Sequence, residues 1–269
     1  MLVTESELLR QIEEAARGAG EIMRSAHRED LHVRSKAGRT NFVTQYDSQV
    51  QNFLVGRLGE ILPEAAFLGE EDGRDLFRPE YEQGYLFVID PIDGTTNFMH
   101  DLPPYVTSIG LLKDGQPYAA VIYCPETDQL FSALAGGGAC ENGRPIHSSE
   151  QPLSDSIALC GTSGYNLDSA AKARRIEYAY QHLCQGVRSM GCAEYALAMV
   201  ASGRAGLYQE LEIQIWDYAA GGLLLMEAGG RITDMEGAPL SFRGGSSVLA
   251  VSAGVARDVQ RVAEPMEMK

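Results

Sequence analysis

The sequence is poor in positive charge and has no long apolar run. Of its 269 residues, 22 are Lys or Arg and 37 are Asp or Glu, which gives a formal net charge of −15. That sign argues against non-specific binding to nucleic acid or to an anionic membrane, because both carry negative charge themselves. No stretch approaches the roughly 20 apolar residues of a membrane span, and residues 1–25 lack the apolar core of a signal peptide. We therefore expect neither a membrane nor a nucleic acid as partner.

Cysteine is also scarce and its spacing carries no motif. The five cysteines form no Cys-x-x-Cys pair and have no zinc-site spacing with the five histidines. An odd, scattered set is typical of a reduced protein, so we expect a cytoplasmic location. The content of 45% hydrophobic and 22% charged residues is ordinary for a globular chain with a substantial core, long enough for one large domain or two smaller ones.

The first third of the chain reads as two helices, a hairpin and a short strand. Thr4 and Glu7 have capping-box spacing, and apolar residues then recur at helical period. The weak alternation of residues 32–47 suggests a hairpin, after which Asp47 is expected to cap a second amphipathic helix. Residues 66–73 read as a short strand that ends in an acidic turn.

Strands dominate the middle of the chain, and strands and helices alternate in the second half. Residues 105–146 contain Asp-Gly and Asn-Gly turns between β-rich runs, which predicts an antiparallel meander. After a break near residue 150, the pattern predicts strands within 156–161, 186–191, 205–213, 231–234 and 247–253, and helices at 168–185, 192–203, 217–228 and 254–262. We expect two layered subdomains, 1–150 and 151–269, with a cleft between them.

The segment "DPIDGTTNF" directly follows the buried-strand pattern "GYLFVI". Asp90 is expected to close that strand, held extended by the proline that follows. Gly94 permits a tight turn, and Thr95 or the next residue is expected to begin a helix with exposed backbone N–H groups. Asp90 and Asp93 would thus converge beside an anion-binding helix start, an arrangement that suits a metal ion and a phosphate.

Acids also stand at two other element ends, in "GEED" (69–72) and at Asp217 after Trp216. Each acidic place has an ordinary structural explanation. "GEED" is also explained as a solvated turn. Asp90 and Asp93 are also explained as turn-forming residues, and Asp217 as a helix cap. The residue pattern by itself leaves open whether these acids meet.

With "GEED", "DPIDGTTNF" and "WDYAAGG" in this order, the chain resembles the inositol monophosphatase family of magnesium-dependent, lithium-sensitive phosphatases. The resemblance covers nearly the whole chain. "KAGRTNFVTQYD" resembles an early Lys/Asp segment of the family, "NFMHDLPPYVTSIGL" continues its central motif, and "MEAGGRITD" extends its C-terminal motif. The resemblance implies an α+β fold, the layered α-β-α-β-α sandwich of the inositol monophosphatase and fructose-1,6-bisphosphatase type, and a homodimer.

The resemblance further implies two or three Mg²⁺ ions, bound by Glu70, Asp90, Asp93, Asp217 and the backbone carbonyl of Ile92. Mg²⁺ is a hard cation that takes oxygen ligands. Four buried carboxylates without a cation would repel one another and raise one another's pKa values. In a two-metal interpretation Asp90 bridges the ions, with Glu70 and Ile92 on one, and Asp93 and Asp217 on the other.

For catalysis, the resemblance implies attack by a metal-activated water without a phosphoenzyme, and Glu70 is counted with the catalytic residues. Thr95 would take the proton of the water, supported by Asp47, for which a plain helix cap stays the alternative. The backbone N–H groups of Gly94 and Thr95 would hold phosphate oxygens, with Asp93 beside them. Lys36 matches a family lysine near the active site, and a solvated lysine is the alternative.

In the family the second subdomain holds the alcohol half of the substrate. Glu210 matches a glutamate that contacts sugar hydroxyls, and Ser163 and Ala193 match other lining positions. Glu194 departs from the family pattern, because many relatives carry a small or apolar residue there. Lining the pocket, it would disfavour a second phosphate and favour a cationic leaving group; pointing outward, it would have no such effect.

We therefore predict a Mg²⁺-dependent phosphomonoester hydrolase that acts on inositol-1-phosphate and related small polyol phosphates. Alternatives within the family are phosphatases of histidinol phosphate, fructose-1,6-bisphosphate, and 3′-phosphonucleotides or NADP. An alternative of another class is a regulatory protein that binds partners through the same fold. The complete metal-ligand set and the acidic charge weigh against a purely regulatory role.

Overall fold

Helices and strands alternate along a chain that a computed structural model describes over residues 4–27, 29, 31–37, 41–72, 77–161 and 167–257, without the side chains of residues 36, 37, 41 and 167. The α-helices are α1 (Glu5–Arg24), α2 (Gln45–Ile61), α3 (Thr95–Met99), α4 (Leu167–Tyr180), α5 (Ala193–Ala201), α6 (Ala219–Glu227) and α7 (Ala253–Ala256). Short 3₁₀ turns are η2 (Glu70–Asp72), η3 (Pro79–Glu82), η4 (Leu153–Asp155) and η5 (Ile215–Asp217).

The strands form a hairpin and two larger sheets. The hairpin pairs β1 (Arg34–Ala37) with β2 (Asn41–Val43). The first sheet holds β3 (Ala66–Gly69), β4 (Tyr85–Asp93), β5 (Val106–Lys113), β6 (Gln116–Cys124), β7 (Gln129–Leu134), β8 (Gly138–Glu141) and β9 (Arg144–Ile146). The second sheet holds β10 (Ile157–Cys160), β11 (Gly186–Arg188), β12 (Leu207–Ile213), β13 (Arg231–Thr233) and β14 (Ser246–Val251).

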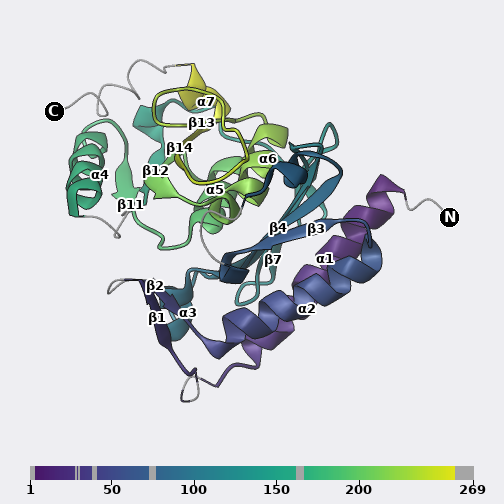
Figure 1. Cartoon of the computed structure of the whole chain (residues 1–269). Helices are drawn as coiled ribbons and strands as arrows, with labels where there is room; N and C mark the ends of the chain where they lie inside the picture. The colour runs from purple at the N-terminus through teal and green to yellow at the C-terminus, as the bar shows by residue number, and fades with distance from the viewer. Residues whose placement is uncertain are drawn as a thin grey trace.

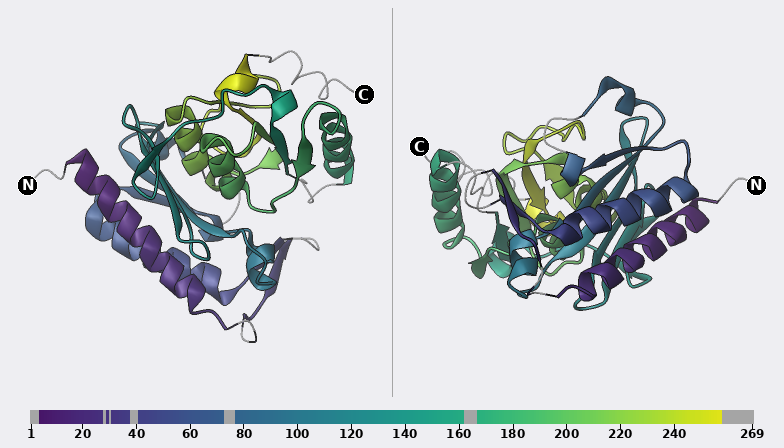
Figure 2. Two further views of the ribbon diagram at one scale, coloured as in Figure 1. Left: turned by 180° about the vertical axis from the view of Figure 1, so that it is seen from behind. Right: turned by 60° about the horizontal axis from the view of Figure 1, so that its bottom comes forward.

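The elements stack in five layers (Figure 1). Helices α1 and α2 cover one face of the first sheet, and α5 and α6 separate its other face from the second sheet. Helix α4 lies on the far side of the second sheet, where its Ile176 shares a hydrophobic cluster with Val255 of α7. The two views of Figure 2 show the same order from behind and from below. This α-β-α-β-α sandwich confirms the predicted fold class.

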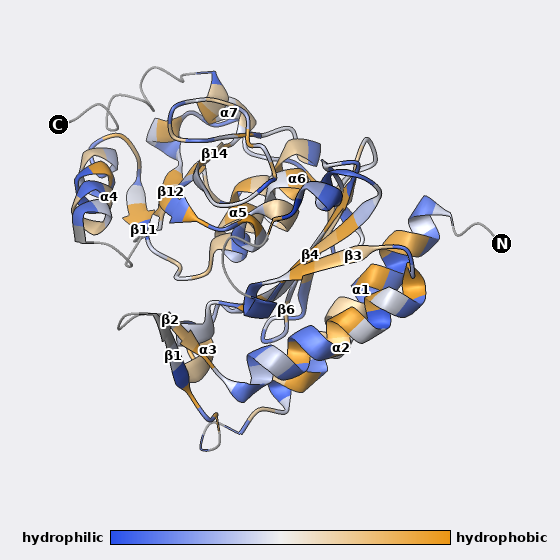
Figure 3. Cartoon of the chain, in the orientation of Figure 1, coloured by the Kyte–Doolittle hydropathy of each residue, from blue (hydrophilic) through white to orange (hydrophobic). Residues whose placement is uncertain are grey.

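The first sheet is the predicted meander with one parallel edge. Its strands follow the sequence order from β3 to β9, and every pair except β3 with β4 is antiparallel. Helix α1 begins as predicted, since the hydroxyl of Thr4 accepts a hydrogen bond from the backbone N–H of Glu7. Hydrophobic and hydrophilic residues alternate along α1 and α2 (Figure 3), and their apolar residues pack on this sheet.

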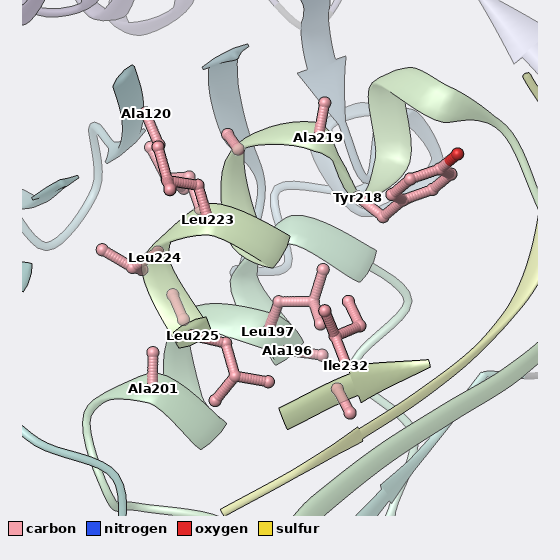
Figure 4. Packing of buried hydrophobic residues seen from close by; sticks show 14 of the residues in the cluster. Ala120, Ala196, Leu197, Ala201, Tyr218, Ala219, Leu223, Leu224, Leu225 and Ile232 are labelled. Carbon is pink, nitrogen blue, oxygen red and sulfur yellow. The ribbon is translucent and has the colours of Figure 1, made fainter. Parts of the chain in front are cut away.

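Helices α5 and α6 form the buried middle layer, because apolar side chains surround them on both sides. Leu197 of α5 and the run Leu223–Leu225 of α6 point into this cluster (Figure 4). Helix α6 packs tightly against the first sheet at Gly110, where a Cβ atom would lie 2.9 Å from the Cβ of Ala219. A glycine at this point of β5 therefore sets the position of the helix that follows Asp217.

The second sheet has the strand order β11-β10-β12-β14-β13. Strand β10 is parallel to both of its neighbours, and β14 is antiparallel to both of its own. Because β9 ends at Ile146 and β10 begins at Ile157, we keep the division into subdomains near residue 150 as a proposal. No helix in the part of the chain that the structure describes is long and apolar enough to cross a bilayer.

Some predicted boundaries were wrong. Strand β4 does not close at Asp90 but continues to Asp93. Helix α2 is capped by Thr44, and Asp47 is its third residue. Helix α4 ends at Tyr180, before the predicted residue 185. The last predicted helix, 254–262, lies partly outside the described residues, and α7 covers its described start.

Candidate active site

A bulge at the end of β4 brings Asp90 and Asp93 to one face of the first sheet. Asp90 pairs with Ser108 of β5 and Asp93 with Val106, so that two residues of β4 stand opposite one residue of β5. Successive side chains of a regular strand alternate between faces, and residues three apart would point in opposite directions. The extra residue restores a common direction. Both aspartates line the same cavity.

Gly94 turns the chain from β4 into α3. Its φ angle of 85° lies in the left-handed region, which glycine adopts without strain. A Cβ atom there would also lie 3.2 Å from the backbone oxygens of Pro104 and Gly191. Helix α3 then begins at Thr95, as the sequence predicts. The turn thus places Thr95 in the lining of the same cavity as the two aspartates.

Asp47 and Thr95 come together although they are far apart in the chain. One carboxylate oxygen of Asp47, Oδ2, accepts hydrogen bonds from the backbone N–H (2.7 Å) and the hydroxyl (2.6 Å) of Thr44, which completes a capping box. The other oxygen, Oδ1, lies 3.3 Å from the hydroxyl of Thr95, which also lies 3.0 Å from the carbonyl oxygen of Ile92. The start of α2 therefore orients Asp47 toward Thr95.

Asp93 accepts hydrogen bonds from the start of α5. Its carboxylate receives the backbone N–H groups of Ala193 (3.1 Å) and Glu194 (2.6 Å) and the thiol of Cys192 (3.1 Å). Burial nevertheless raises the pKa of Asp93 to about 6, with a smaller contribution from the negative charge of Glu70. The end of β4 is thereby tied to the middle helix layer.

Asp217 stands at the end of η5, just before α6. Its Oδ2 atom accepts a hydrogen bond from the backbone N–H of Gln214 at 2.8 Å. Burial raises the pKa of Asp217 well above its ordinary value, and the charges of Glu70 and Asp93 raise it further. Three acids from separate parts of the chain therefore act electrostatically on one another, which the residue pattern alone had left open.

All five residues predicted to bind metal line one cavity of about 360 Å³: Glu70, Asp90, Ile92, Asp93 and Asp217. Among the described residues, no three acidic, His or Cys side chains converge closely enough to form a ready-made metal group. The five predicted ligands still suit a hard cation, since each of them offers an oxygen atom. Acids whose pKa values are raised by burial and mutual charge gain most from a bound cation.

Strand β12 and the end of β10 also contribute to the wall of the cavity. Glu210 lines it and accepts a hydrogen bond from the hydroxyl of Tyr208, another lining residue. Its carboxylate lies against Gly161, where a Cβ atom would stand 2.2 Å from the carboxyl carbon. Ala193 lines the cavity as well. Ser163 and the side chain of Lys36, both predicted near the site, lie outside the described residues.

Sequence reasoning missed Glu212, Tyr208 and Cys160, which also line the cavity. Glu212 and Tyr208 stand two residues after and before Glu210 on β12, so the two-residue period of a strand was the signal that could have found them. Cys160 is the last residue of β10, and nothing in its sequence surroundings marks it.

Glu194 neither lines the pocket nor points outward, which were the two alternatives raised for it. Its side chain is 0% exposed and is not part of the cavity lining. Its carboxylate accepts the backbone N–H groups of Ala220 (3.1 Å) and Gly221 (2.6 Å) at the start of α6. Burial raises its pKa well above the ordinary value. Glu194 thus joins α5 to α6 inside the middle layer.

Comparison with known proteins identifies the family of this chain. The sequence model of the inositol monophosphatase family matches residues 4–264. The chain belongs to the inositol monophosphatase family. It is 32% identical over 247 residues to the inositol-1-monophosphatase of Bacillus subtilis, covering 90% of this chain and 91% of that protein. It is 36% identical over 227 residues to the Nus factor SuhB of Xylella fastidiosa, covering 83% and 80%.

Among solved structures, the extragenic suppressor protein suhB of Bartonella henselae superimposes with a TM-score of 0.86. It is 32% identical in sequence, and the match covers 95% of this chain and 97% of that one. The family membership makes this chain a phosphatase of the inositol monophosphatase type. The roles of the individual cavity residues stay predictions.

Proposed function

We propose that this family member is a Mg²⁺-dependent phosphomonoesterase that acts on inositol-1-phosphate and related small polyol phosphates. The observation that carries the proposal is a single cavity that is lined both by the four acids from η2, β4 and η5 and by Glu210 of β12. A polyol phosphate presents the same two parts, a dianionic phosphate and a set of hydroxyl groups. The relative from B. subtilis is named for this activity.

Glu70, Asp90, Asp93, Asp217 and the carbonyl of Ile92 are the residues that would hold Mg²⁺. Bound there, Mg²⁺ supplies positive charge for the phosphate and lowers the pKa of a water molecule. The residues of the chain handle the proton. As the Thr95 hydroxyl takes a proton from the attacking water, its own proton passes to the carboxylate of Asp47, 3.3 Å away. Thr44 holds that carboxylate in place through two hydrogen bonds.

Binding of the two halves of the substrate follows from the cavity walls. The backbone N–H groups of Gly94 and Thr95 stand at the start of α3 and are proposed to hold phosphate oxygens. Glu210 is proposed to accept hydrogen bonds from ring hydroxyls, which are stronger when the acceptor is charged. Ala193, beside Asp93, leaves room for the ring because its side chain is small.

The test is phosphate release by the purified protein from inositol-1-phosphate, histidinol phosphate, fructose-1,6-bisphosphate and a 3′-phosphonucleotide, in Mg²⁺ and in EDTA. We expect Mg²⁺-dependent release that is fastest for inositol-1-phosphate. Inositol-1-phosphate turning over no faster than histidinol phosphate refutes the substrate assignment. Absence of metal-dependent release from every substrate refutes the enzymatic proposal.

Asp90→Asn tests the proposed cation site, because Asp90 is one of the residues that would hold Mg²⁺. We expect it to remove nearly all turnover while the circular dichroism spectrum and the oligomeric state stay unchanged. Glu126→Gln, in an exposed turn away from the cavity, is the matched control and should keep the wild-type rate. A tenth or more of the wild-type kcat in Asp90→Asn at saturating Mg²⁺ contradicts the role.

The similarity to the Nus factor SuhB of X. fastidiosa favours one second candidate, a regulatory role exercised through a partner. One protein can perform both functions. The phosphate-release assay decides whether the cavity is catalytically active. A homodimer and a cytoplasmic location stay predictions, to be checked by light scattering of the purified protein and by fractionation of the source cells.

A further inference from the structure

Glu212 adds a second carboxylate to the part of the cavity wall that β12 forms, the alcohol end, where the ring hydroxyls of the substrate are proposed to bind. It follows Glu210 by two residues on β12, and Tyr208 precedes Glu210 by two. Alternate residues of a strand share a face, and all three residues line the cavity. Gln209, between two of them, is 0% exposed and lies outside the lining. The strand therefore presents two acids side by side to whatever occupies this end.

The charge of Glu212 is not neutralised by the described parts of the protein. Its carboxylate accepts a hydrogen bond from the hydroxyl of Ser169 on α4, a neutral donor. No Lys or Arg among the described residues forms an ion pair with it. The described lining of the cavity contains six carboxylates and no Lys, Arg or His. Four of those carboxylates are accounted for by the proposed cation site, and Glu210 and Glu212 remain.

A neutral polyol does not require the second charge. Hydroxyl groups donate to one carboxylate as the proposed function describes, and a second one beside it only adds electrostatic repulsion. A protonated amine on the ring changes this balance, because it donates up to three hydrogen bonds and carries the opposite charge. A second phosphate or a carboxylate on the ring would be repelled. The alcohol end is thus complementary to a ring that carries both hydroxyls and an ammonium group.

We propose that Glu212, together with Glu210, makes this chain selective for phosphomonoesters of amino-substituted ring polyols, that is, amino-sugar or aminocyclitol phosphates. The inference rests on the proposed phosphatase function and narrows its substrate class. Glu210 binds ring hydroxyls, and Glu212 binds the ammonium group. Ser169 is a positioning residue, since its hydroxyl holds the Glu212 carboxylate toward the cavity.

The experiment compares two substrates that differ by one charged group, glucosamine 6-phosphate and glucose 6-phosphate, at pH 6.5 in Mg²⁺. We expect the wild-type protein to prefer the amine by about tenfold in kcat/KM, mainly through KM, with the preference reduced by added salt. Glu212→Gln keeps the shape and an acceptor for Ser169 but removes the charge. It should abolish the preference, because kcat/KM for glucosamine 6-phosphate falls toward the value for glucose 6-phosphate.

Two further variants sharpen the result. Ser169→Ala should weaken the preference partly, because the charge stays while its orientation is lost. Glu126→Gln, the exposed control, should keep the full preference. Equal kcat/KM values for both substrates in the wild type overturn the proposal, and so does a preference that survives in Glu212→Gln.

A binding measurement separates this inference from the proposed function. The dephosphorylated alcohols, glucosamine and glucose, are titrated into the wild type and Glu212→Gln in Mg²⁺ and followed by NMR. If neither sugar phosphate nor inositol-1-phosphate releases phosphate, the proposed function fails. The titration still decides the inference. Glucosamine binding at least fivefold tighter than glucose in the wild type, but not in Glu212→Gln, supports it. Equal affinities of the wild type for the two sugars overturn it.

Discussion

Replacing Glu194 by alanine is the most direct test of how the middle helix layer is held together. The side chain is fully buried, and its carboxylate is the acceptor for two backbone donors at the start of α6, Ala220 at 3.1 Å and Gly221 at 2.6 Å. The alanine variant leaves both donors inside the protein without this acceptor. It also opens a small void between α5 and α6.

The expected cost follows from these contacts. A buried donor left without an acceptor costs about 1–3 kcal/mol, so two donors cost roughly 2–6 kcal/mol. Part of this is offset, because the variant no longer buries a carboxyl group whose raised pKa reports a desolvation cost. We expect Glu194→Ala to lose about 2–4 kcal/mol of unfolding free energy, and Glu194→Gln, which keeps one oxygen acceptor, about 1–2 kcal/mol.

Urea unfolding at pH 7.5 in EDTA measures the effect, with the slope m compared to confirm that the same surface is exposed. A loss of this size lowers Tm by roughly 4–16 °C in a protein of this length. The control is Glu126→Ala, an exposed position that should stay within about 0.5 kcal/mol of the wild type. If Glu194→Ala also stays within that range, the two hydrogen bonds do not hold α6, and the reasoning is refuted.

Three further outcomes follow from the site. Gly161→Ala places a Cβ 2.2 Å from the carboxyl carbon of Glu210, and this flexible side chain can move away. We therefore expect KM for inositol-1-phosphate to rise about tenfold and Tm to change by less than 2 °C. An unchanged KM contradicts this. Asp217→Asn should raise the Mg²⁺ concentration for half-maximal activity at least tenfold, and an unshifted Mg²⁺ titration rejects Asp217 as a ligand. In metal-free protein, the pKa of Asp93 is raised from 3.8 to about 6. The native state therefore holds a proton that the unfolded chain has released, and urea unfolding should show stability falling by on the order of 3 kcal/mol as the pH rises from 4 to 6.5. Saturating Mg²⁺ should flatten this fall, and stability that rises with pH in EDTA speaks against it.

Features that depend on local chemistry could be predicted from the sequence. The turns of the meander are an example: Asp114-Gly115 and Asn142-Gly143 all adopt positive φ angles between 48° and 73°, as the hairpin turns preferred by Asp-Gly and Asn-Gly require. The capping box of α1 is another local pattern. The acids of the cavity were found by family resemblance, since their spacing in the chain leaves open whether they meet.

Features that depend on distant partners could not be predicted. The bulge that turns Asp90 and Asp93 to one face exists only in the register of β4 against β5. Glu194 is a charged residue in an otherwise apolar helix, and its partners lie 26 and 27 residues further along the chain. Glu212 is different, because it shares the period of a strand with Glu210 and a strict reading of that period would have identified it.

The fold orients the acids of the cavity without neutralising them. Asp217 receives one N–H group, from Gln214. Asp93 receives two from the start of α5, where a helix carries about half a positive charge. These donors lower the pKa of Asp93, yet burial raises it more, and the result is about 6. Hydrogen bonds that fully offset the cost of burying the charge would have left the pKa of Asp93 at or below 3.8. These backbone N–H groups therefore hold the carboxylates in place, and the remaining negative charge is what a divalent cation would bind.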